Sequence, residues 1–254
     1  MISLAGKAAL ITGGSRGIGA ACVRLFARAG ADIVFSYHRD ASSAERVAQE
    51  SRRHGTRVEF FKADLAKMAP AEKLVKFSHE RLGRLDILVA NAGIWNVEDL
   101  PIEKMSERDW DHMMAVNLKS VYSVIHFAVP HMIRQRSGRI VAVSSTAGQR
   151  GEALHSHYGA TKGAIISLVK GLSTELAPHN ILVNSVAPGW VDTDMSKPVF
   201  KDKKALKQIL EKQPLRRVAT AEECAGPILF LASDLSSFIT GEILNVNGGS
   251  VLCG

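Results

Sequence analysis

The sequence has 254 residues, of which 46% are hydrophobic and 22% charged, and its formal net charge is +7. This length and composition are typical of one large globular domain, and no apolar run reaches the eighteen residues expected of a membrane span. The amino-terminal stretch MISLAGKAALITGG lacks the pattern of a secretory signal, so we expect a cytoplasmic protein.

The positive charge is compatible with binding to nucleic acid, a membrane surface or an acidic substrate. We interpret it as a solvated basic surface, because the basic residues are spread along predicted helices and no nucleic-acid motif accompanies them. The three cysteines, Cys22, Cys224 and Cys253, are scattered and show no CxxC spacing. Neither a disulfide framework nor a metal site is therefore expected.

Apolar runs of strand length alternate with amphipathic stretches along the whole chain. The predicted strands are 8–12, 32–37, 57–61, 85–91, 138–145, 180–188 and 242–246. The predicted helices are 17–29, 41–54, 69–82, 107–135, 158–177 and 220–233. This alternation predicts an α/β fold over 1–254: a single Rossmann-type domain whose doubly wound parallel sheet has about seven strands flanked by helices.

One segment between two predicted strands, 194–212, departs from the alternation. It contains many lysines and a proline, and we expect it to be irregular. Such segments often form mobile flaps over a site, so 190–212 is predicted to be a substrate-binding flap.

A glycine-rich turn follows the first predicted strand and opens the first helix. Gly13, Gly17 and Gly19 lie in LITGGSRGIGAA, where glycine permits a tight turn and close approach of a pyrophosphate. The helix N-terminus adds free N–H groups and the positive end of the dipole. A glycine turn without a ligand is the alternative, but the position after strand one favours a dinucleotide. The other residues of the turn expected to contact it are Ser15, Arg16 and Ile18.

The end of the second predicted strand bears on which nicotinamide cofactor binds. An acidic residue there accepts the ribose hydroxyls of NAD, whereas basic groups accommodate the 2′-phosphate of NADP. Tyr37 occupies that position and is followed by His38 and Arg39, while Arg16 lies in the glycine turn. We interpret Asp40 as the N-cap of the next helix. The sequence therefore favours NADP (NADPH) over NAD.

Several motifs in order resemble those of the short-chain dehydrogenase/reductase family, over essentially the whole chain. They include TGGSRGIG, NAG at 91–93, AVNLKS, a serine thirteen residues before Tyr-x3-Lys, PGWVDT at 188–193 and the closing GEILNVNGG. A lone Tyr-x3-Lys is a weak signal, but six motifs at family spacing are specific. The cofactor contacts that the resemblance implies are Asp64, Leu65, Asn91, Ala92, Gly93, Tyr158, Lys162, Pro188, Gly189, Val191 and Thr193.

The predicted chemistry is the reduction of a carbonyl, with Tyr158 as the group that exchanges a proton with the substrate oxygen. Lys162 lies one helical turn away and favours the phenolate by its charge. Ser145 is expected to hydrogen-bond the substrate oxygen, with Ser144 as the alternative that the spacing to Tyr158 disfavours. The resemblance implies that Asn117 positions a water connecting Lys162 to bulk solvent.

Aromatic and histidine side chains near these motifs are candidates for the substrate pocket. Trp95, Trp190 and Met195 are expected at its mouth, although core packing explains them about equally well. His155 and His157 flank the tyrosine, but the Tyr–Lys pair already supplies the acid–base chemistry. In the family, substrate choice lies in the loops corresponding to 94–100, 146–157 and the flap.

Among its relatives, the chain resembles bacterial 3-oxoacyl-(acyl-carrier-protein) reductases through MIRQRSGRIV and FLASDLSSFITGEILNVNGG. The resemblance implies acyl carrier protein, which is strongly acidic, as a possible partner of the basic surface. Arg136 matches a basic docking position, whereas His179 replaces a second one that is usually arginine. The run EALHSHY also departs from the usual residues before the tyrosine.

Other functions remain open from the sequence. They are an alcohol or sugar dehydrogenase, a cofactor-binding scaffold without catalysis and, last, a nucleic-acid-binding protein. Intact Ser145, Tyr158 and Lys162 argue against a scaffold. The family is typically tetrameric, and the apolar terminus SVLCG is compatible with burial at a subunit interface.

Overall fold

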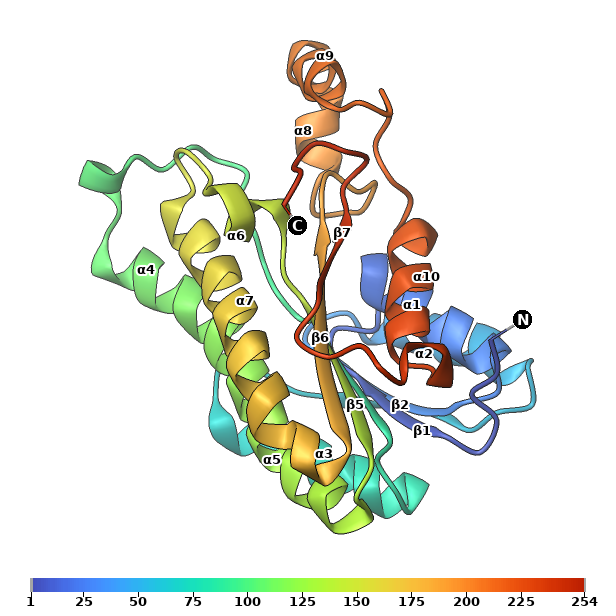
Figure 1. Cartoon of the computed structure of the whole chain (residues 1–254). Helices are drawn as coiled ribbons and strands as arrows, with labels where there is room; N and C mark the ends of the chain where they lie inside the picture. The colour runs from blue at the N-terminus through green and yellow to red at the C-terminus, as the bar shows by residue number, and fades with distance from the viewer. Residues whose placement is uncertain (1, 254) are drawn as a thin grey trace.

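A computed structural model describes residues 2–253 and contains one seven-stranded sheet in the order β3-β2-β1-β4-β5-β6-β7. Neighbouring strands are parallel throughout. The strands are β1 (Ala8–Ile11), β2 (Asp32–Tyr37), β3 (Val58–Lys62), β4 (Ile87–Ala90), β5 (Gly138–Val143), β6 (Ile181–Pro188) and β7 (Ile243–Val246). The predicted doubly wound α/β fold is confirmed (Figure 1).

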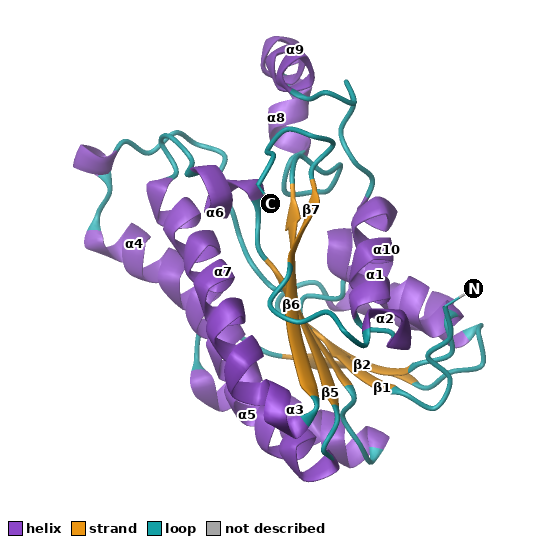
Figure 2. Cartoon of the chain, in the orientation of Figure 1, coloured by secondary structure: helices purple, strands orange, loops and turns teal. Residues whose placement is uncertain are grey.

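Helices cover both faces of the sheet (Figure 2). The longer ones are α1 (Gly17–Arg28), α2 (Ala41–Arg52), α3 (Met68–Leu82), α4 (Glu107–Met114), α5 (Ser120–Gln135), α7 (Ser156–Leu176), α9 (Lys203–Lys212) and α10 (Ala221–Leu231). The short ones are η1 (Ile102–Lys104), the π-helical η2 (Ala115–Lys119), α6 (Thr146–Arg150), η3 (Ala177–His179), α8 (Lys197–Lys201) and η4 (Asp234–Ser236). Within residues 2–253, none is long and apolar enough to span a membrane.

Two hydrophobic clusters explain why the central strands are continuously apolar. In β1, Ala9 and Ile11 belong to the cluster beneath α1, α2 and α10, whereas Leu10 belongs to the cluster beneath α3, α5 and α7. In β4, Val89 belongs to the first cluster and Leu88 to the second. Successive strand residues point to opposite faces, and both faces are covered here, so every position is apolar.

The sheet changes winding direction between β1 and β4, because β2 and β3 extend from one side of β1 and the later strands from the other. In open sheets of this kind, ligands bind beyond the carboxyl ends of the strands at the switch point. The glycine turn after β1 and the NAG motif after β4 both lie there. The topology therefore predicts the site at this edge before any side chain is considered.

The prediction that 194–212 is irregular is wrong, because most of it forms α8 and α9. Asp202 starts α9 by accepting hydrogen bonds from the backbone N–H groups of Lys204 at 2.8 Å and Ala205 at 3.2 Å. A side-chain acceptor at this position satisfies N–H groups that have no partner within the helix. Lysine is also a good helix former, so the lysine content favours rather than opposes a helix.

Three predicted boundaries also need correction. The predicted helix 107–135 is divided into α4 and α5 by the π-helical turn η2. The predicted strand 138–145 ends at Val143, because Ser145 leaves the sheet to cap α6. Helix α7 starts at Ser156, two residues earlier than predicted, so His157 and Tyr158 both lie in its first turn.

A short bridge joins the two ends of the segment that contains the flap. Asp192 donates its backbone N–H to Ala219 O at 2.8 Å, and Ala219 donates to Trp190 O at 3.0 Å. Together they form a parallel bridge between Val191 and Ala219. Beyond this bridge, α8 and α9 protrude from the body of the molecule (Figure 1).

Two cysteines that are far apart in sequence become neighbours where α1 packs on α10. The thiols of Cys22 and Cys224 are buried and free. Burial raises the pKa of both thiols, that of Cys224 to about 12. Buried thiols with raised pKa values are inert packing groups at neutral pH.

Candidate functional site

The glycine turn after β1 is held by backbone contacts that leave no room for side chains. Gly13 has φ +69°, and its N–H donates to Ser36 Oγ at 3.1 Å. A Cβ at Gly19 would lie 2.2 Å from Gly13 O. Arg16 occupies the N-cap of α1, and its side chain has no acceptor for the first N–H groups of the helix. These N–H groups and the helix dipole therefore suit a phosphate group.

A hydrogen-bonded clamp joins this turn to the NAG motif across the switch point. Thr12 Oγ1 accepts the N–H groups of Asn91 and Ala92, both at 2.9 Å. Asn91 Nδ2 donates to Thr12 O at 2.9 Å and to Gly13 O at 3.4 Å. Sequence reasoning missed Thr12 and Ser36, although a hydroxyl at the end of a buried apolar strand is a usable signal.

The Pro-Gly motif after β6 reaches the same turn from the other side. A Cβ at Gly17 would lie 3.3 Å from Thr193 Cγ2, so the predicted contact residue Thr193 packs on the first residue of α1. Gly189 donates to Val246 O at 3.1 Å and lies close to Asn247. Val191 is buried beneath the flap bridge. Of the four predicted residues of this motif, Thr193 contacts the glycine turn, whereas Gly189 lies beside β7 and Val191 lies in the flap bridge.

The end of β2 presents basic groups, as the sequence predicts. Tyr37 packs its ring against Phe60, with centroids 5.7 Å apart, while His38 and Arg39 are exposed. Asp40 Oδ1 accepts the N–H of Ser43 at 2.9 Å, which confirms its predicted role as the N-cap of α2. The hydrogen bond from Ser43 lowers the pKa of Asp40 to about 2.

Beyond β3, Asp64 and Leu65 lie at the same edge of the sheet. Asp64 Oδ1 accepts the N–H of Ala66 at 3.2 Å, and Leu65 is buried. Asp64 also lies 4.0 Å from Lys67 in a weak ion pair. These two predicted cofactor contacts therefore lie at the same end of the sheet as the glycine turn and the end of β2.

Asn117 lies in the π-helical turn η2, and its side-chain amide is fully engaged. Oδ1 accepts the N–H of Ile94 at 2.7 Å, and Nδ2 donates to Ile94 O at 2.8 Å. A Cβ at Gly93 would lie 3.2 Å from Asn117 Oδ1 and 3.6 Å from Lys162 Nζ. Asn117 thus fixes the segment after β4 directly beside Lys162. Single π-turns inside helices are frequent at functional sites.

Tyr158 and Lys162 lie on one face of α7, as their spacing predicts. Lys162 Nζ donates to Val143 O at 2.8 Å and lies 5.8 Å from the centroid of the Tyr158 ring. Ser145 Oγ accepts the N–H of Ala147 at 3.1 Å and also hydrogen-bonds Tyr158. Ser144 Oγ instead donates to Lys162 O at 2.8 Å. Of the two serines, Ser145 therefore lies beside the phenol and Ser144 supports α7.

Burial decides the protonation of both groups. It raises the pKa of Tyr158 to about 12, against the opposing hydrogen bond from Ser145. It lowers the pKa of Lys162 to about 8. Without a ligand, the expected stabilisation of a phenolate by Lys162 is therefore outweighed by desolvation. Tyr158 therefore carries its proton at neutral pH.

Four rings from three segments pack in series near this pair. The Trp95 ring stacks on His155, with ring centroids 4.9 Å apart, and meets Trp190 edge-on, with centroids 5.8 Å apart. Trp190 in turn contacts Phe200 of α8, with centroids 5.8 Å apart. We call Trp95, His155, Trp190 and Phe200 the aromatic cluster. It joins loops 94–100 and 146–157 to the flap, the three regions expected to set substrate choice. Phe200 was missed from sequence, and Met195 is exposed outside the cluster.

His155 and His157 are both buried but differ in their surroundings. Among residues 2–253, His155 Nε2 and His157 Nδ1 are buried nitrogens without a hydrogen-bond partner. Burial lowers the pKa of His157, and the neighbouring His155 adds to this effect. Lone buried imidazoles of lowered pKa are neutral near pH 7, so His157 is a packing residue of α7.

Arg136 and His179 lie at the opposite edge of the sheet from Tyr158. Arg136 precedes β5 and His179 precedes β6, and Asn180 Nδ2 donates to Arg136 O at 3.1 Å. The structure brings the exposed Arg136 close to the half-buried His179. They are separated from the site by the length of β5, about 20 Å at the usual rise per residue.

The fold and the sequence together assign the chain to a family. A family model described as enoyl-(acyl carrier protein) reductase matches residues 13–250. The chain belongs to the short-chain dehydrogenase/reductase family, whose members are NAD(P)-dependent oxidoreductases that interconvert carbonyl and alcohol groups.

Curated relatives of this chain include 3-oxoacyl-[acyl-carrier-protein] reductases. The FabG protein of Chlamydia muridarum is 41% identical over 97% of this chain and 98% of its own length. That of Thermotoga maritima is 39% identical, over 98% and 99%. Similar solved structures are a Serratia marcescens short-chain dehydrogenase/reductase mutant (TM-score 0.90, 36% identity, 97% and 98% covered) and levodione reductase (TM-score 0.92, 28% identity, 96% and 97% covered).

Proposed function

We propose that this protein is an NADPH-dependent reductase of 3-oxoacyl thioesters. The observation that carries the proposal is the arrangement of Ser145, Tyr158 and Lys162 beside the glycine turn. The curated relatives named 3-oxoacyl-[acyl-carrier-protein] reductase support an acyl thioester as the substrate. The basic groups around the end of β2 support NADPH.

The proton-transfer half of the reaction follows from the chain's own residues. Tyr158 is protonated before substrate binds, since burial raises its pKa to about 12, and it is the group placed to donate a proton to the carbonyl oxygen. A raised pKa makes the phenol a weaker acid, so the transfer requires stabilisation of the tyrosinate by Lys162. Ser145 Oγ hydrogen-bonds the same oxygen and holds it within reach of the phenol. NADPH, when bound, supplies the hydride that the carbonyl carbon receives.

Lys162 stabilises the tyrosinate that the transfer leaves behind. Its Nζ is anchored by Val143 O, so the charge stays in place between Tyr158 and Gly93. Asn117 holds Gly93 and Ile94 against this lysine through both atoms of its amide. We therefore propose Asn117 as a positioning residue rather than as a ligand of the water that the resemblance implies.

NADPH fits the donors present around the glycine turn. The backbone from Gly13 to Gly19 and the start of α1 would hold the pyrophosphate. The guanidinium groups of Arg16 and Arg39 are available to a 2′-phosphate, which planar guanidinium binds through two hydrogen bonds. Asp40, the acid nearest to this position, is occupied by the cap of α2.

The proposal is tested with a substrate panel. We expect 3-oxoacyl thioesters to be reduced with a kcat/KM at least roughly tenfold higher with NADPH than with NADH, since a bidentate phosphate contact contributes about that factor. Cyclic ketones and sugars belong in the panel as well, because the aromatic cluster offers flat faces suited to a ring. A clear preference for NADH, or for a cyclic ketone over every thioester, would overturn the proposal.

The pH dependence of kcat/KM for the reduction should follow the protonation of Lys162. Its pKa is lowered to about 8, so the ammonium is present below that value and is lost as the pH rises through it. We expect kcat/KM to be level from about pH 6 to 7 and to fall to about a tenth by pH 9. Tyr158, with a raised pKa, stays protonated over this range. A profile that remained level to pH 9.5 would contradict this role of Lys162.

We further propose a homotetramer. β7 is the edge strand of the sheet, and edge strands are usually covered. Large apolar side chains near it are exposed: Leu235, Phe238 and Leu252. Sedimentation velocity measures the oligomeric state directly.

A further inference from the structure

We propose that the outer groove of α9 is the docking surface for the acidic carrier protein that delivers the acyl substrate. This inference rests on the proposed function, since it concerns how a carrier-bound thioester reaches the site. The argument uses the shape of the groove, its charge and its position relative to Tyr158.

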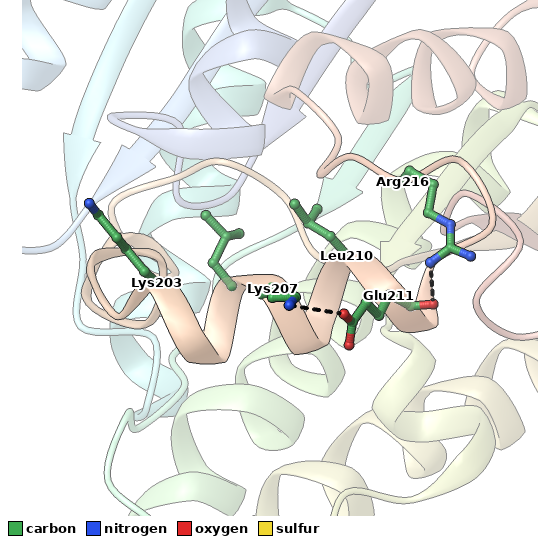
Figure 3. Close-up of a pocket in the computed structure, with 6 residues that line it drawn as sticks. Lys203, Lys207, Leu210, Glu211 and Arg216 are labelled. Atoms are coloured by element: carbon green, nitrogen blue, oxygen red, sulfur yellow. Dashed lines mark hydrogen bonds and ion pairs between the residues drawn. The ribbon is translucent and has the colours of Figure 1, made fainter.

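The groove is an open hollow along one face of α9, bordered at one end by Arg216 of the segment that follows the helix (Figure 3). Its volume is about 340 Å³, and its lining residues are Lys203, Leu206, Lys207, Leu210, Glu211 and Arg216. Leu206 and Leu210 form an apolar floor one turn apart. Arg216 Nη1 donates to Glu211 O at 2.7 Å, which holds the following segment against the end of the helix.

The apolar face of α9 is not packed into the body of the domain. All ten residues of the helix are half-buried or exposed, although Leu206, Ile209 and Leu210 recur at helical spacing. A short amphipathic helix normally depends on packing of its apolar face for stability. An apolar floor with a charged rim is the usual anatomy of a protein-binding patch.

The charge of the chain is concentrated around this groove. Residues 197–217 contain eight lysines and arginines but only two acidic residues, whereas the rest of the chain is almost neutral. The net positive charge is thus concentrated in this exposed segment rather than spread along all the helices. A partner complementary to this segment is acidic, and complementary charge accelerates association.

The form of the groove favours a protein over a polyanion. Nucleic acid would meet two leucines on the floor, and Glu211 in the last turn of α9 would repel its phosphates. An acidic helix, in contrast, can pair its carboxylates with Lys203 and Lys207 and place apolar side chains on the floor. We therefore commit to an acidic helical surface of the carrier protein as the occupant.

The position of α9 connects docking to chemistry on the same chain. The flap begins at Trp190 and continues through Phe200, and both residues belong to the aromatic cluster. Another member of the cluster, His155, precedes Tyr158 by three residues. A carrier on α9 thus sits above the entrance to the site. Arg136 and His179, the docking positions implied by the resemblance, lie at the far edge of the sheet of this chain.

The test compares one acyl group on two carriers, acyl carrier protein and a small thiol such as N-acetylcysteamine. In the double variant Lys203→Gln/Lys207→Gln, we expect the ratio of kcat/KM on the carrier-bound to that on the small thioester to fall roughly tenfold, with a weaker salt dependence. The matched control is Lys73→Gln/Lys76→Gln on α3. Lys76 lies 3.9 Å from Glu80, as Lys207 lies 3.8 Å from Glu211, and its loss should leave the ratio unchanged.

Other outcomes separate the alternatives. A fall of the ratio in Arg136→Gln with no change in the α9 variant would overturn the proposal in favour of the far edge. A smaller oligomer on sedimentation of Leu206→Ser, with the ratio unchanged, would assign the groove to a subunit interface. If the unaltered protein reduces neither thioester, the proposed function fails. In that case, docking is tested by measuring the binding of the carrier protein alone at low salt. The docking proposal is overturned if the carrier protein does not bind, or if it binds the α9 variant equally well.

Discussion

Tyr158→Phe is expected to reduce kcat for carbonyl reduction by about a thousandfold while leaving NADPH binding within twofold. A positioned general acid contributes roughly 10² to 10⁴ in rate, and phenylalanine removes only the hydroxyl. The ring remains, so the packing of α7 and the 5.8 Å contact with Lys162 Nζ persist. Steady-state kinetics and a fluorescence titration with NADPH measure the two quantities separately.

The matched control is Tyr122→Phe, which removes a hydroxyl from an exposed tyrosine of α5. It should change neither quantity. Turnover retained in Tyr158→Phe would remove this tyrosine from the mechanism and would leave Ser145 as the remaining hydroxyl beside the substrate. Loss of NADPH binding would instead mean that the phenol supports the cofactor site rather than proton transfer.

Gly19→Ala is expected to weaken NADPH binding at least roughly a hundredfold and to lower the free energy of unfolding by about 1–3 kcal/mol, the usual cost of overpacking. The added Cβ would lie 2.2 Å from Gly13 O and 2.6 Å from Asn91 Nδ2. Neither atom can yield without opening the turn, because Gly13 O is backbone and Asn91 belongs to the clamp with Thr12. NADPH titration and denaturant unfolding measure the two effects.

Gly226→Ala supplies the control for this substitution. Gly226 lies in α10, and a Cβ there would meet open space. Alanine should stabilise the helix by up to about 1 kcal/mol, since glycine is the poorer helix former. If Gly19→Ala bound NADPH normally, the close packing of the turn would not be needed for the cofactor.

The fold could be predicted because its strands are buried on both faces and its helices on one. Those two patterns differ in period, so the alternation was visible, and the motifs fell at strand ends where an α/β sheet binds ligands. Asp40 was correctly interpreted as a cap because a carboxylate before a helical run has a specific local use. These are features in which neighbours in sequence are also neighbours in space.

The missed features depend on contacts between distant segments. Thr12 and Ser36 act through backbone groups of other strands, which local sequence does not reveal. The aromatic cluster joins residues up to about a hundred positions apart, so Phe200 carried no signal by itself. The helix α9 is a different case. Its cap and its leucine spacing were present in the sequence but were outweighed by the lysines and the proline.

The bridge between Val191 and Ala219 has a consequence for how such a protein diversifies. The bridge holds the two ends of the intervening segment together, and Leu215 adds a second anchor by donating its N–H to Gly248 O at 3.2 Å. The distance between the ends of the part from 194 to 214 therefore does not depend on what lies between them. Lengthening a loop whose ends are already fixed costs little in free energy, about 0.6 kcal/mol per doubling. The segment can therefore be exchanged as a cassette, with its own charge and partner, while the hydride-transfer core is inherited intact. Mutations that change how the substrate is delivered and mutations that change the reaction then fall in different parts of the same protein.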